Sequence, residues 1–134
     1  MRHVVVVEDD AVNALLLRTV LQRRGGFKVT LTEDPAEVLG LARAGGVDLI
    51  LLDVSLGQSY WEGRAVSGVD ICRLLKGDDA TAAIPVILAT AHAMRGDSGR
   101  FLADSGANDY VAKPIVDLEA FIAQVRSWMP AEAA

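Results

Sequence analysis

The sequence contains a single cysteine, Cys72, and only two histidines among its 134 residues. One cysteine cannot form an internal disulfide, and no Cys/His cluster offers the ligand spacing of a zinc site. A chain of this length buries about two-thirds of the surface that its unfolded form exposes, so a hydrophobic core alone can hold it together. Low cysteine content without metal spacing is typical of a reducing compartment, and we expect a cytoplasmic protein.

Long apolar runs and basic clusters are also missing. No stretch approaches the ~20 apolar residues of a membrane span, and the valine run Val4–Val7 is too short for a signal peptide. Lys and Arg number 13 against 18 Asp and Glu, which gives a net charge of −5. Affinity for phosphate backbones comes mainly from clustered cations, and Arg23-Arg24 is an isolated pair. We therefore expect neither a membrane nor a nucleic acid as partner.

The sequence does contain short apolar runs that alternate with amphipathic stretches. The predicted strands are Val4–Val7, Phe27–Leu31, Leu49–Leu52, Ile84–Ala89 and Tyr110–Val111. The predicted helices are Ala11–Arg24, Pro35–Ala44, Val69–Lys76, Arg95–Ser105 and Asp117–Trp128, with Asp10, Asp34 and Asp117 placed to begin three of them. This alternation predicts an α/β fold, a parallel sheet covered on both faces. We expect one domain over residues 1–130 and a frayed end over residues 131–134.

Polar residues follow the predicted strands where each one ends. Glu8-Asp9, Asp53, Thr90 and Lys113 stand after the first, third, fourth and fifth strands. Such residues gather at the carboxyl edge of an open α/β sheet. Carboxylates ~4 Å apart repel by about 4 kcal/mol at an effective dielectric constant of 20, so the cluster requires a cation or raised pKa values. A partial carboxylate cage suits Mg²⁺, while Lys113 and Thr90 suit a transferring phosphoryl group and Asp53 is the best-placed nucleophile.

Four motifs occur in order: VVVVEDD at the first strand, DLILLDVSL at the third, PVILATA at the fourth and GANDYVAKPI at the fifth. In this order and spacing the sequence resembles the receiver domain of bacterial two-component response regulators. The resemblance covers nearly the whole chain. It implies a flavodoxin-like, doubly wound, five-stranded parallel sheet with strand order 2-1-3-4-5 and helices on both faces.

The resemblance also implies roles for the clustered residues. Asp53 would accept a phosphoryl group from a histidine kinase or a histidine phosphotransfer protein, in a Mg²⁺-dependent reaction. Glu8 and Asp9 match the acidic pair that holds Mg²⁺ together with Asp53, and the metal would also take the backbone carbonyl of Ser55. Thr90 and Lys113 match the residues that hold the phosphoryl oxygens. The chain would catalyse only its own phosphorylation and dephosphorylation, with no separate substrate turnover.

By the same resemblance, Thr90 and Tyr110 form a switch. Phosphorylation would change the surface around the fourth helix, fifth strand and fifth helix, which would alter the binding of a downstream protein and could support a homodimer. Ser55 and His92 match positions that tune the lifetime of the aspartyl phosphate, although a solvated loop histidine without a role is as good an interpretation of His92.

The sequence departs from the family pattern after Asp53, where the loop over residues 57–67 is several residues longer than usual. Tyr60 and Trp61 in this loop could contact a partner, because aromatic residues are enriched at interfaces. Equally, they could fold back over the third helix as a local lid.

Three other functions compete with a phosphorylated receiver. A degenerate receiver could act as a phosphorylation-independent interaction module, although all five residues of the motif set are present. A Mg²⁺-dependent phosphatase with an aspartate nucleophile would need a general acid two residues on, where this sequence has Ser55. A flavodoxin-like cofactor binder would need a Gly-rich phosphate loop after the first strand, where this sequence has acids.

Overall fold

The computed structural model describes residues 2–54, 60–61, 63–90, 105–113 and 115–129. Its strands are β1 (His3–Val7), β2 (Lys28–Thr32), β3 (Leu49–Asp53), β4 (Tyr60–Trp61), β5 (Arg64–Ala65), β6 (Val86–Thr90) and β7 (Asp109–Ala112). Its helices are α1 (Ala11–Arg23), α2 (Pro35–Ala44), α3 (Gly68–Lys76) and α5 (Leu118–Ser127). The predicted helix over residues 95–105 and the predicted lifetime residues Ser55 and His92 fall outside the described residues, apart from Ser105.

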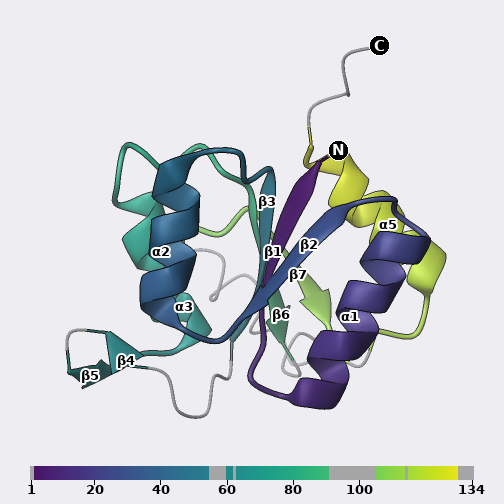
Figure 1. Ribbon diagram of the computed structural model, residues 1–134, viewed down its shortest axis with the longest axis horizontal. Helices are drawn as coiled ribbons and strands as arrows, with labels where there is room; N and C mark the ends of the chain where they lie inside the picture. The colour runs from purple at the N-terminus through teal and green to yellow at the C-terminus, as the bar shows by residue number, and fades with distance from the viewer. Residues whose placement is uncertain (1, 55–59, 62, 91–104, 114, 130–134) are drawn as a thin grey trace.

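The main sheet has five parallel strands in the order β2-β1-β3-β6-β7, which confirms the predicted 2-1-3-4-5 topology. Helices α1 and α5 cover one face of this sheet, and α2 and α3 cover the other (Figure 1). The chain reverses its direction of travel across the sheet after β2. The carboxyl ends of β1 and β3 therefore flank the switch point of the fold.

Each face of the sheet has its own apolar core, and the side-chain period of two in a strand explains why. In β1, Val5 and Val7 pack with α2 and α3, whereas Val4 and Val6 pack with α1 and α5. Burial on both faces accounts for the uninterrupted apolar runs of β1 and β3, which carry no polar alternation. Cys72 is fully buried in the α2–α3 core, as expected for a small apolar residue.

Helix ends agree with the sequence to within one residue. Asp10, Asp34 and Asp117 cap α1, α2 and α5, and each carboxylate accepts a backbone hydrogen bond from the first turn. Strand ends differ by up to two residues. The fourth predicted strand begins at Val86 rather than Ile84, because Pro85 cannot donate to the ladder and the Ile84 carbonyl accepts from Lys76 Nζ at 2.8 Å.

The long loop after β3 contains a short hairpin that the sequence did not predict. Tyr60 pairs with Ala65 and Trp61 with Arg64, in antiparallel register, and Gly63 takes a φ of +79° at the turn. The hairpin backbone at β4 contacts α2. Figure 1 shows it beside the lower end of α2. The side chains of Tyr60 and Trp61 lie outside what the structure describes, so their predicted partner role stays a prediction.

Within the described part of the chain, none of the helices combines the length and apolar character needed to cross a bilayer.

Candidate functional site

The site lies where four strands of the main sheet end. Glu8 and Asp9 directly follow β1, and Asp53 is the last residue of the adjacent β3. Thr90 ends β6, and its carbonyl accepts a hydrogen bond from the Lys113 backbone at 3.0 Å. The parallel topology therefore brings together all five residues that the sequence singled out.

Three carboxylates meet at this edge of the sheet. One oxygen from each of Glu8, Asp9 and Asp53 lies within 4.8 Å of the others. Glu8 is 6% exposed and Asp53 is 4% exposed, so bulk water screens their charges poorly. This concentration of negative charge has to be offset by a cation or by protonation.

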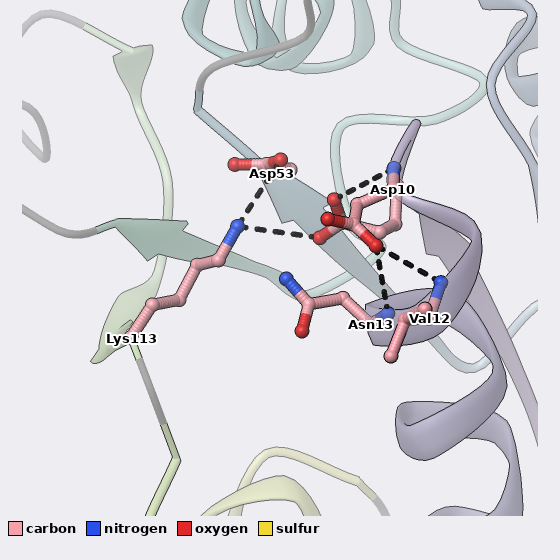
Figure 2. A network of polar contacts seen from close by, with 6 residues as sticks. Asp10, Val12, Asn13, Asp53 and Lys113 are labelled. Carbon is pink, nitrogen blue, oxygen red and sulfur yellow. Dashed lines mark hydrogen bonds and ion pairs between the residues drawn. The ribbon is translucent and has the colours of Figure 1, made fainter.

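Lys113 supplies one positive charge. Its Nζ lies 3.2 Å from Asp53 Oδ2 and 3.4 Å from Glu8 Oε2. Figure 2 shows the lysine reaching across from one side of the site while Asp10 and the start of α1 close the other side. Burial alone would lower the pKa of Lys113, but the charges of Asp53 and Glu8 outweigh it and raise the pKa. The lysine is therefore held as a cation between two carboxylates.

Glu8 is the carboxyl of the site whose pKa is raised. Burial raises its pKa from 4.5 to about 7, and a hydrogen bond shared with Asp53 acts in the same direction. The backbone N–H of Asp10 donates to Glu8 Oε1 at 3.2 Å and opposes the shift. Near neutral pH, Glu8 is thus divided between its neutral and charged forms.

The donor set fits a hard divalent cation. Glu8, Asp9 and Asp53 each offer a carboxylate oxygen, and proteins commonly bind Mg²⁺ with a few carboxylates while water or phosphate oxygens complete its coordination. A cation there would also remove the cost of ionising Glu8. The fourth ligand expected from the sequence, the carbonyl of Ser55, lies outside the described residues.

Gly68, the first residue of α3, touches the backbone of the acceptor residue. A Cβ built on Gly68 would lie 1.9 Å from the carbonyl oxygen of Asp53, and its N–H donates to the Val54 carbonyl at 3.1 Å. Only glycine allows α3 to approach so closely. The predicted third helix begins one residue later, at Val69, and no local pattern predicts that Gly68 packs against the backbone of Asp53.

An apolar groove of about 260 Å³ adjoins the site between α1 and α5. Its polar end is formed by Glu8, Asn13 and Lys113, and its walls are leucine, valine, isoleucine and phenylalanine side chains. In Figure 2 the amide of Asn13 lies between Lys113 and the first turn of α1. No short stretch of the sequence predicts this groove, because its walls come from segments about 100 residues apart.

Residues 4–126 match the family described as response regulator receiver domain. The polar-differentiation response regulator DivK of Brucella anthropi is 36% identical over 128 residues, which cover 96% of both chains. Among solved structures, the receiver domain of the sensor histidine kinase PA1611 from Pseudomonas aeruginosa PAO1 is 28% identical, with a TM-score of 0.78 and coverage of 95% and 96%. That structure holds a magnesium ion coordinated in its active-site cleft.

A putative response regulator from Chloroflexus aurantiacus, 24% identical over 95% of this chain and 96% of its own, shares the fold with a TM-score of 0.80. Sequence and fold thus agree along nearly the full length of the chain. The protein belongs to the response regulator receiver domain family of two-component signalling.

Proposed function

We propose that this receiver accepts a phosphoryl group on Asp53 from a phosphohistidine of a partner protein, and that Mg²⁺ assists the transfer. The observation that carries the proposal is the set of contacts around Asp53. A buried carboxylate lies 3.2 Å from a lysine ammonium and within 4.8 Å of two further carboxylates. Such an arrangement suits the transfer of a group that itself carries negative charge.

In the proposed reaction a carboxylate oxygen of Asp53 attacks phosphorus, and the bond between phosphorus and the donor imidazole nitrogen breaks. The imidazole keeps the electron pair of that bond, and an acyl phosphate remains on Asp53. Lys113 and the Thr90 hydroxyl hold the phosphoryl oxygens. Glu8, Asp9 and Asp53 would hold the Mg²⁺ ion, which supplies charge neutralisation when bound.

The aspartyl phosphate would act through Thr90 and Tyr110. Thr90 is buried at the end of β6, where its partner on β7 is Ala112, and Tyr110, two positions earlier on β7, is half-buried against the α2–α3 core. A phosphoryl group gives Thr90 a new hydrogen-bond acceptor, which favours a conformer with Tyr110 turned inward. The resulting change in surface would alter the binding of a downstream protein.

Exposed apolar residues beside the site support a protein rather than a small molecule as the phosphodonor. Val12, Leu15 and Leu16 on α1 and Val116 before α5 are between 49% and 88% exposed. Exposed apolar surface of this kind commonly marks a protein interaction site. Leu16 also lines the groove that opens beside Lys113, so a partner bound there would sit close to Asp53.

Intact-protein mass spectrometry tests the proposal. The protein is incubated with Mg²⁺ and acetyl phosphate and compared with Asp53→Asn, and Asp117→Asn serves as the matched control because asparagine also caps a helix. We expect a single phosphoryl adduct in the wild type and the control, lost in Asp53→Asn and with EDTA. An adduct that persists in Asp53→Asn would refute Asp53 as the acceptor. If the wild type forms no adduct and beryllofluoride leaves its spectrum unchanged, a phosphorylation-independent interaction module becomes the better interpretation.

A further inference from the structure

Asp109, the first residue of β7, is the centre of a hydrogen-bond network that lies away from the acidic site. Its Oδ1 accepts from the backbone N–H of Tyr110 at 2.8 Å. Its Oδ2 accepts from Gln124 Nε2 at 3.0 Å and from Trp128 Nε1 at 2.8 Å. Gln124 Nε2 also donates to the carbonyl of Tyr110 at 2.7 Å. Side chains therefore bond both backbone polar groups of Tyr110.

The network joins the outermost strand of the sheet to the end of α5. Among the described residues β7 is an edge strand that pairs with β6 alone, and α5 packs against the same sheet. Gln124 lies in the second half of α5, and Trp128 is the residue that caps it. Hydrogen bonds to a carboxylate are roughly twice as strong as those between neutral groups. β7 and the end of α5 are thus held together as one unit at Tyr110.

The opposite end of β7 leads directly into the acidic site. Lys113 follows β7, its backbone bonds Thr90, and its ammonium contacts Asp53. The four residues of β7 span about 13 Å at ~3.3 Å per residue. One short strand therefore connects the proposed phosphoryl site at its carboxyl end with the Asp109 network at its amino end.

We propose that the hydrogen bonds of Asp109 with Gln124 and Trp128 couple the state of Asp53 to the end of α5, so that phosphorylation changes the environment of the Trp128 indole. The inference rests on the proposed function. A phosphoryl group adds up to about two negative charges next to Lys113 and draws the lysine and Thr90 toward it. Because β7 is bonded to α5 at Tyr110, a shift of the strand changes the bond between Asp109 and Trp128.

The indole N–H of Trp128 reports this bond directly. The chain has two tryptophans, so a ¹⁵N-labelled sample gives two indole signals, and Trp61→Phe assigns them. The signals are recorded with Mg²⁺ before and after beryllofluoride is added, which imitates the phosphoryl group. The ¹⁹F signal of bound beryllofluoride independently measures occupancy of Asp53.

We expect the Trp128 indole proton to shift when beryllofluoride binds, and to stay unchanged in Asp53→Asn. Gln124→Leu should keep the bound ¹⁹F signal but lose most of the Trp128 response, because Gln124 no longer links the Tyr110 carbonyl and the Asp109 carboxylate to α5. Glu119→Gln, on the same helix and paired with Arg24, is the matched control and should respond like the wild type.

Two results would overturn the coupling while leaving the proposed function intact. The first is bound beryllofluoride with an unmoved Trp128 signal, and the second is a full Trp128 response in Gln124→Leu. Absence of bound beryllofluoride in the wild type would instead remove the proposed function, and the coupling with it.

Discussion

The charge on Glu8 should set the pH dependence of stability when Mg²⁺ is absent. Its pKa in the folded protein is about 7, against 4.5 for an ordinary glutamate. The folded state therefore binds this proton more tightly than the unfolded chain does. The stabilising contribution of protonated Glu8 is present below pH 4.5 and is lost as the pH rises toward 7. A shift of this size corresponds to roughly 2–3 kcal/mol of lost stability between pH 5 and pH 8.

Glu8→Gln isolates this contribution, because glutamine imitates the neutral carboxyl at every pH. In urea unfolding with EDTA, the free energy of unfolding of the variant minus that of the wild type should be larger at pH 8 than at pH 5, by roughly 2–3 kcal/mol. Comparing the two proteins cancels the titration of every other group. Exposed Glu37→Gln is the control and should show no such trend. Mg²⁺ should recover most of the difference by stabilising the wild type at pH 8. An equal gain at both pH values would show that Glu8 ionises without cost and refute the reasoning.

Three further predictions concern packing and charge around the site. Gly68→Ala should destabilise the protein by about 3 kcal/mol, because the added Cβ would meet the Asp53 carbonyl. Gly40→Ala, in an open part of α2, is the control and should stabilise the protein by about 0.8 kcal/mol. Equal changes in melting temperature for the two variants would contradict this. Lys113→Met should lower the free energy of unfolding more at pH 8 than at pH 5. The loss should be smaller than the about 3–5 kcal/mol expected for breaking a fully buried ion pair, because Lys113 is 23% exposed. Urea titrations at the two pH values check which loss is larger. Thr81→Val should cost about 1–3 kcal/mol in chemical denaturation, because the buried hydroxyl donates at 2.5 Å to a carbonyl of α3, and an unchanged midpoint would exclude this bond as a stabilising contact.

The sheet and the clustered residues were predictable because each depends on a local signal. Apolar runs mark buried strands, and the topology then places the residues after those runs at one edge. The prediction that Glu8, Asp53 and Lys113 lie together needed no information about distances, and the structure brings the three side chains into contact. The starts of α1, α2 and α5 were equally predictable, because an aspartate that caps a helix can be recognised from a few adjacent residues.

Features that depend on distant parts of the chain were not predictable in the same way. The groove beside Lys113 is lined by residues of α1 and of the segment around the start of α5, and no short window of sequence shows that these two segments face each other. The bond between Asp109 and Trp128 joins residues 19 positions apart through their side chains. The β4–β5 hairpin was missed because two-residue strands are too short to show alternation, and Gly63 alone is a weak turn signal.

The contact between Val54 and Gly68 has a consequence for how this receiver can vary. Because the Gly68 N–H bonds the Val54 carbonyl at 3.1 Å, the two ends of the segment between these residues lie next to each other beside Asp53. The cost of closing a loop grows only slowly with its length, so residues can be added to or removed from such a segment cheaply. We therefore expect the length of this segment to vary without moving Asp53.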